Sequence, residues 1–338
     1  MTLNTIGDQA RAFAMQSASN RLKTTMSTLT QEMASGEVAD LGLRLQGNTR
    51  ALNEIENRIG VTRQLQRNAS EAAIQLQAMQ DMFGAVRTTT EDLRNALISD
   101  TFADSRVQMM VRGIGIGQTF EAVVQHLNGA NSNRFLLSGQ ASTVAPLSSP
   151  TVMLDALEAL TAGMTSATEV ATAISDWFDA PAGAGGFLDT AYHGTLDANV
   201  QIPISEGIAV NVGTTAASPA VRDLLKGIAS IAILSRNVLA GNPEETRQLM
   251  SQAGMTLMNA DMSVVGEMSR IGLSQQITER AQSANTASLY TLERGRNDIR
   301  RADPYETATA LAEVQAQLDS HFAVTARLSK LRLVDYLR

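Results

Sequence analysis

The sequence has no cysteine among its 338 residues and few aromatic residues, which make up only 4% of the chain. The absence of cysteine excludes a disulfide framework, a thiolate metal site and a cysteine nucleophile. Alanine, leucine, methionine, serine and threonine fill the apolar and small positions instead. This composition favours long helices that pack through small side chains over a core of large aromatic anchors.

The chain also has no excess of positive charge and no long apolar run. Its formal net charge is −7 and its pI is about 5.1, which argues against a nucleic-acid binder, because phosphate neutralisation needs a clustered basic face. A run of about 18 apolar residues is missing, so we expect no membrane span. The first residues have neither a basic segment nor an apolar one, so we expect no cleaved secretory signal.

Signatures of catalysis and of cofactor binding are missing as well. The three histidines, His126, His193 and His321, are scattered, and a zinc site needs three or four convergent ligands. His321 lies near the apolar stripe of the C-terminal segment, and we expect it to be a polar interruption of that stripe. The glycines of residues 113–117 match neither a dinucleotide fingerprint nor a phosphate-binding loop, and they predict a weakened helical turn. The acidic pair at 244–245 falls at a helix start, where the helix dipole explains it. We therefore predict no catalytic, cofactor-binding or metal-binding residue and no enzymatic activity.

Both ends of the chain carry apolar residues at the spacing of a coiled coil. Near the N-terminus the steps between apolar residues are seven, four, three and four, and the stretch stops at Gly36. Near the C-terminus, Asp303 and Pro304 mark a helix start, and the helix runs to about residue 337. At about 1.5 Å per residue this helix would be roughly 50 Å long. Since such a helix is too narrowly apolar to be stable alone, each end is the natural partner of the other.

The segments between the ends have different residue patterns. Helical patterns cover about 52–97 and 105–128, two shorter ones cover 152–162 and 166–178, and Asn242-Pro243 marks the start of a further helix. Residues 199–204 and 208–212 alternate in polarity, which predicts two strands joined in a hairpin.

We predict a mainly α fold, in which a long antiparallel helical bundle or coiled coil from both chain ends carries a small α+β insert. The expected domains are residues 1–40 with 303–338, residues 41–139 with 216–302, and the insert 140–215.

Three segments resemble the flagellin family. Residues 297–309 (NDIRRADPYETAT) are similar to the stretch that opens the last helix in that family, with Asp303 and Glu306 at its capping positions. The chain also ends in Leu337-Arg338, as the family does. Residues 20–36 resemble its N-terminal amphipathic helix ending in Ser-Gly. Residues 133–139 (NRFLLSG) are similar to a segment typical of the hook-associated members, which join the hook to the filament. The Asp-Asp pair that usually follows Ser-Gly is missing from residues 37–50.

The resemblance implies a structural subunit of the bacterial flagellum, exported unfolded through the flagellar type III channel and located outside the cell. The implied partners are other flagellar axial proteins (hook-associated proteins and flagellin), copies of itself and an export chaperone, without nucleic acid, membrane or cofactor. The residues expected at the assembly interface lie on the two terminal helices. They are Phe13, Leu22, Met26, Leu29, Met33, Leu311, Val314, Leu318, Phe322, Leu328 and Leu331.

Several alternatives stay open from the residues themselves. A filament subunit of the same family would fit both ends, although its insert is usually larger than the one of about 75 residues seen here. An ordinary globular bundle also carries apolar stripes on its helices. A helical sensor module would need a membrane anchor or a ligand pocket, and the sequence offers neither.

Overall fold

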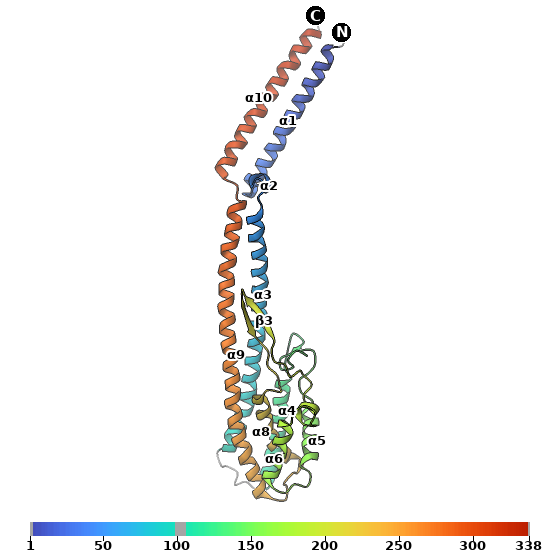
Figure 1. Ribbon diagram of the computed structural model, residues 1–338, viewed down its shortest axis with the longest axis vertical. Coiled ribbons are helices and arrows are strands. Elements are labelled where there is room, and N and C mark those ends of the chain that lie inside the picture. The colour runs from blue at the N-terminus through green and yellow to red at the C-terminus, as the bar shows by residue number, and fades with distance from the viewer. Residues whose placement is uncertain (1–2, 99–105, 337–338) are drawn as a thin grey trace. The chain divides into compact units, whose positions relative to one another are not determined.

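The computed structural model describes the backbone of residues 3–98 and 106–336, with side chains at 9–95, 97 and 115–327. Its helices are α1 (Leu3–Ser35), α2 (Leu41–Arg44), α3 (Arg50–Ile98), α4 (Arg106–Leu127), α5 (Pro150–Thr161), α6 (Ala167–Asp179), α7 (Phe187–Thr190), α8 (Pro219–Ala232), the 3₁₀ helix η1 (Ile233–Arg236), α9 (Pro243–Arg300) and α10 (Pro304–Tyr336). Its strands are β1 (Ala130–Asn131), β2 (Arg134–Phe135), β3 (Gln201–Ser205) and β4 (Ile208–Asn211). The predicted fold class, mainly α with a small β insert, is confirmed (Figure 1).

The chain forms two compact units. Unit 1 holds residues 1–62 and 287–338, and unit 2 holds residues 63–286. The helices α3 and α9 contribute residues to both units. The three-part division expected from the sequence stays a prediction.

The predicted start and stop signals act where the sequence places them. Asp303 Oδ1 accepts hydrogen bonds from the backbone N–H groups of Tyr305 and Glu306, at 2.9 and 3.2 Å, and so caps α10. At the start of α9, Asn242 Oδ1 accepts from the N–H of Glu245 at 3.4 Å. Helix α1 stops at Gly36, whose φ of +70° is a left-handed conformation that glycine adopts without strain. Each of these predicted boundaries is confirmed.

The core of unit 2 forms where α8 packs against α4 and α6. Helix α8 buries most of its residues, among them Leu225 and Ile228, and α4 contributes Phe120 and Val124. Gly227 lets α8 approach α9 closely, because a Cβ at this position would lie 2.8 Å from the side chain of Leu257. The predicted short helices around 152–162 and 166–178 are confirmed as α5 and α6.

An aromatic cluster fills the space between α6 and α7. The Trp177 and Phe178 rings meet edge to face at 4.9 Å between centroids, and Phe187 lies 5.2 Å from Phe178. Phe178 and Phe187 are buried completely. Arg222 Nη1 donates to the carbonyl oxygen of Phe178 at 3.0 Å, which ties α8 to the end of α6. The rings therefore pack α6 against α7 within the insert, and the backbone of Phe178 links the insert to α8.

The predicted hairpin is the antiparallel pair β3–β4, with a bulge between Pro203 and Ser205. Its first strand begins and ends slightly later in the chain than predicted. Two asparagine side chains fix it to the long helices. Asn68 Nδ2 of α3 donates to the carbonyl oxygen of Pro203 at 2.9 Å, and Asn285 Nδ2 of α9 donates to that of Ile204 at 2.7 Å. The hairpin backbone is therefore held by side chains from both helices.

A charged cluster joins α3 to α9 inside unit 2. Asp261 lies 2.8 Å from Arg87 Nε and 2.9 Å from Arg94 Nη1, and the side chains of Asp261 and Arg94 are only 20% and 17% exposed. Burial alone would raise the pKa of the Asp261 carboxyl, but the hydrogen bond from Arg87 and the charges of Arg94 and Arg87 outweigh it. The pKa of Asp261 therefore lies below its usual value.

This cluster gives unit 2 a pH-dependent stability. Since the folded pKa of Asp261 is below the unfolded one, its contribution is complete above about pH 4 and is lost as the pH falls through the folded pKa. We expect Asp261→Asn to lower the free energy of unfolding at neutral pH by about 1.5–3 kcal/mol and to flatten its acid dependence. Urea unfolding at several pH values measures both effects. The exposed Glu206→Gln is the control, and an equal acid slope in both variants would contradict the assignment.

Candidate assembly interface

The two terminal helices lie side by side within unit 1. Helix α10 ends beside the start of α1, so the pair is antiparallel (Figure 1). The ammonium group of Lys23 on α1 lies 5.8 Å from the centroid of the Phe322 ring on α10. This cation–π contact crosses from one helix to the other.

The contact between these helices follows a heptad repeat. On α1, five of the half-buried positions advance in alternating steps of four and three residues: Met15, Ser19, Leu22, Met26 and Leu29. On α10, five of the half-buried positions advance in steps of three and four: Leu311, Val314, Leu318, His321 and Thr325. We call these ten positions the terminal seam. Such steps place the side chains on one face of each helix, as in a coiled coil.

The terminal seam is only half covered. None of the described side chains of α1 is buried, and on the described part of α10 only Thr307 is. A groove of about 760 Å³ runs along the pair, where Phe13 and Leu22 of α1 and Val314 of α10 lie among mostly polar lining side chains. The two helices therefore leave space, bordered by a few apolar side chains, that a further helix could fill.

Backbone hydrogen bonds hold the base of the helix pair. The N–H of Val38 donates to the carbonyl oxygen of Arg300 at 2.9 Å, and the N–H of Ala302 donates to that of Gly36 at 2.9 Å. The Arg300 guanidinium lies 2.9 Å from the Glu37 carboxylate. These contacts join the segment after α1 to the segment before α10. The sequence reasoning missed them, because an isolated bridge of two residues has no periodic signal.

The residues predicted for the assembly interface fall into three groups. Six are half-buried in the terminal seam: Leu22, Met26, Leu29, Leu311, Val314 and Leu318. Three are exposed, by 78% at Phe13, 48% at Met33 and 47% at Phe322. Leu328 and Leu331 belong to α10 but lie outside the residues whose side chains are described.

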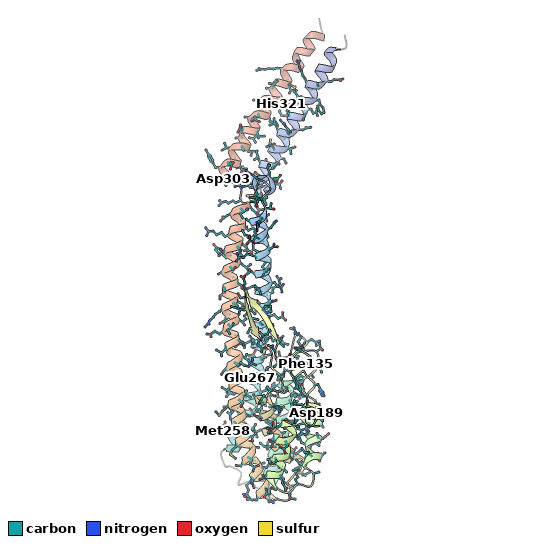
Figure 2. The ribbon with its side chains drawn as sticks, viewed as in Figure 1. Phe135, Asp189, Met258, Glu267, Asp303 and His321 are labelled. Atoms are coloured by element: carbon teal, nitrogen blue, oxygen red, sulfur yellow. The ribbon has the colours of Figure 1, made fainter. Side chains whose placement is uncertain are left out.

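Near the end of the described part of α10, the terminal seam has the polar residue that the sequence predicted, His321, and the aromatic residue also predicted for the interface, Phe322, is exposed. His321 occupies the seam position, and the neighbouring Phe322 lies at the edge of the seam, 47% exposed and in contact with Lys23 of α1 (His321 is labelled in Figure 2). The Nδ1 atom of His321 is buried without a hydrogen-bond partner. A buried polar group of this kind weakens a helix pair but restricts its register.

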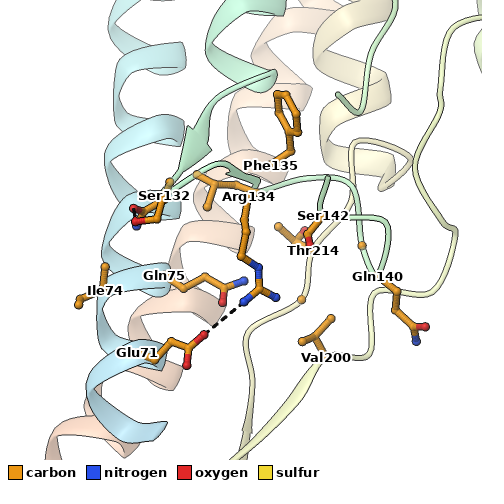
Figure 3. A pocket seen from close by; sticks show the side chains of 14 residues that line it. Glu71, Ile74, Gln75, Ser132, Arg134, Phe135, Gln140, Ser142, Val200 and Thr214 are labelled. Atoms are coloured by element: carbon orange, nitrogen blue, oxygen red, sulfur yellow. Dashed lines mark hydrogen bonds and ion pairs between the residues drawn. The ribbon is translucent and has the colours of Figure 1, made fainter. Parts of the chain in front are cut away.

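Unit 2 contains a separate cavity of about 540 Å³ beside α3 and the β1–β2 hairpin (Figure 3). Arg134 and Glu71 form an ion pair of 3.3 Å across it, and Gln75 and Phe135 also line it. The side chains of Arg134 and Glu71 are 57% and 61% exposed, so this pair is screened by water.

The described residues offer neither a metal-binding cluster nor a membrane-spanning helix. Residues 3–98 and 106–336 contain no group of three histidine, aspartate or glutamate side chains arranged to hold a metal ion. Within the same part of the chain, no helix has the length and apolar character needed to cross a membrane. The paired terminal helices remain the candidate site.

Comparison with known proteins identifies a related fold. No protein-family model matches the sequence, and no curated protein matches it significantly. A solved structure described as "putative flagellar hook-associated protein from Vibrio parahaemolyticus" is similar, with a TM-score of 0.50 and 14% sequence identity. The match covers 75% of this chain and 99% of that one. At this identity the likeness establishes a shared fold.

Proposed function

We propose that this chain is a structural subunit of the bacterial flagellum and joins the hook to the filament. The observation that carries the proposal is the half-covered terminal seam. Two helices of 33 residues each depend on each other, yet leave their contact face partly open to solvent. Long helices gain most of their stability from packing, so such a pair is completed by helices from neighbouring molecules.

The exposed apolar side chains of the same helices support this role. Phe13 on α1 and Phe322 and Val324 on α10 are exposed, and Phe13 borders the groove along the pair. Large exposed apolar groups that adjoin a groove are typical of protein interfaces. We assign to these residues, and to the six half-buried ones, packing against neighbouring subunits.

The shared fold and the sequence resemblance support the flagellar setting. The structural neighbour carries a flagellar hook-associated description. Residues 133–139, which resemble a segment typical of hook-associated members, form the strand β2 and the turn that follows it. The partners would be other axial proteins, copies of this chain and an export chaperone. The protein would act outside the cell as a non-enzymatic component. The second candidate is the filament subunit itself, favoured by the same terminal helices.

The test is a strain that produces only a chain lacking residues 304–338. We expect cells with hooks, without attached filaments, and with filament subunits in the medium, because a junction that cannot close its terminal seam cannot hold the filament. Electron microscopy and analysis of the culture medium measure this, and the full-length chain is the control. Normal hooks and filaments would refute a role in axial assembly.

Immunogold labelling separates the junction role from the filament role. Antibodies against the insert, residues 140–215, should label a narrow band at the hook–filament boundary in cells with the full-length chain. Labelling along the whole filament would instead identify the chain as the filament subunit.

A further inference from the structure

Helix α9 has a second apolar face within unit 2, opposite the face that packs into the core. Its buried side chains include Leu257, Val264 and Ile271. Six apolar side chains on the other face are exposed: Met255 (57%), Met258 (46%), Met262 (70%), Val265 (39%), Leu273 (63%) and Ile277 (43%). We call this face the outer stripe (Met258 is labelled in Figure 2). Its spacing places all six within about a third of the helix circumference.

The outer stripe is suited to contact with another helix. From Ser251 to Ile277 it contains no charged residue, because the remaining positions along it are serine, glycine, asparagine and glutamine. A Cβ added to Gly266 would meet no other atom within 4 Å, so the helix surface is open at this glycine. The Ser269 hydroxyl donates to the carbonyl oxygen of Val265 at 2.8 Å, so its polar group is already satisfied.

We propose that the outer stripe binds the outer stripe of a second copy of this chain, antiparallel, about a two-fold axis beside Met262. In this arrangement a residue before Met262 faces the residue equally far after it in the partner. Met258 then faces Gly266, and Met255 faces Ser269. Large side chains thus meet small ones on both sides of the axis, as close helix packing requires.

Charges at the two ends of the outer stripe match the same register. Glu244 lies 18 residues before Met262, and Arg280 lies 18 residues after it. Since 18 residues make about five helical turns, both side chains lie on the same face as Met262. The antiparallel pair brings Glu244 of each copy opposite Arg280 of the other. The Glu244 side chain contacts Arg247 within its own helix but is still 72% exposed, so it can also meet a partner.

The size of the outer stripe predicts a weak dimer. The stretch from Glu244 to Arg280 is about 54 Å long and, at about 10 Å wide, covers roughly 540 Å² on each copy. The total lies near the lower limit of about 1,200 Å² for specific pairs, which predicts a dissociation constant in the micromolar range. Because all copies in a polar axial assembly point the same way, the antiparallel dimer belongs to the unassembled chain. The dimer itself is argued from the outer stripe alone, so its failure would leave the proposed function standing.

Sedimentation of the purified full-length chain tests the dimer. We expect its mass to rise from 36.1 kDa towards twice that value as concentration increases. Met262→Glu places two like charges at the axis and should weaken the dimer by about 100-fold. Ser263→Glu makes the same charge change about 100° around the helix and should leave the dimer intact. A monomeric wild-type chain, or equal weakening by both variants, would overturn the proposal.

Cysteine cross-linking tests the axis and the register. The chain has no native cysteine, so any disulfide dimer must come from an introduced thiol. Met262→Cys should form disulfide dimers under mild oxidation, and Ser263→Cys should not, because its thiols point away from the axis. Arg280→Glu should weaken the dimer, and adding Glu244→Arg should restore it. Efficient cross-linking through residue 263, or no cross-linking through residue 262, would refute this arrangement.

Discussion

Leu22→Asp should separate the two terminal helices and abolish assembly of the chain. Leu22 is half-buried in the terminal seam and also lines the groove along α1 and α10. An aspartate there would lose its hydration in an apolar contact, and the pair would open to avoid that cost. Alone, neither helix has a broad enough apolar face to stay folded. Because α1 and α10 hold 33 residues each, the loss of helix is large enough for circular dichroism to detect.

The matched control for this variant is Ser27→Asp. Ser27 lies on α1 only five residues further along, but its side chain is exposed. The same charge there should leave the helical content, the protease resistance of unit 1 and filament attachment unchanged. If Leu22→Asp kept its full helical content and still supported attached filaments, the terminal seam would not be the contact that assembly requires.

Helix boundaries could be predicted from the sequence because their causes are local. Asp303 and Asn242 each precede a proline, and each accepts a hydrogen bond from the first turn of its helix. The glycine-terminated end of α1 follows the same logic. Each signal lies within four residues of the boundary that it sets, so no knowledge of the rest of the fold is needed.

The contacts between distant segments could not be predicted in this way. Asp261 binds Arg87, 174 residues away in the chain, and Asn285 binds the backbone of Ile204. Nothing in the local sequence around any of these residues indicates its partner. They become neighbours only once the long helices have packed, so pattern reasoning cannot supply the pairing.

In the terminal seam, too, the sequence pattern could not identify every contact residue. Spacing alone identified Leu311, Val314 and Leu318, which are half-buried. It then continued through Phe322, although His321 occupies the next seam position. Adjacent residues differ by about 100° around a helix, so a slip of one residue moves a side chain to another face. Hydrophobicity favoured the phenylalanine, whereas the heptad geometry of the pair favours the histidine.

Phe178→Ala should cause a large loss of stability in unit 2. Phe178 is completely buried, and its ring contacts both Trp177 and Phe187. Removing the ring leaves a cavity and also removes the aromatic contacts, so we expect the free energy of unfolding to fall by about 3–5 kcal/mol. Because the chain has a single tryptophan, and Trp177 lies in this cluster, its fluorescence during urea unfolding reports on unit 2.

The control for the aromatic cluster is Val152→Ala on α5, where the side chain is 51% exposed. That change should alter the free energy of unfolding by no more than about 0.5 kcal/mol. Comparing the two variants shows whether the few aromatic residues stabilise the fold one by one or as a cluster. Aromatics scattered over the chain would each contribute little, whereas several of them packed together make one small region decisive. If Phe178→Ala lost no more stability than Val152→Ala, the insert would have to be held by the β3–β4 hairpin and its asparagine contacts instead.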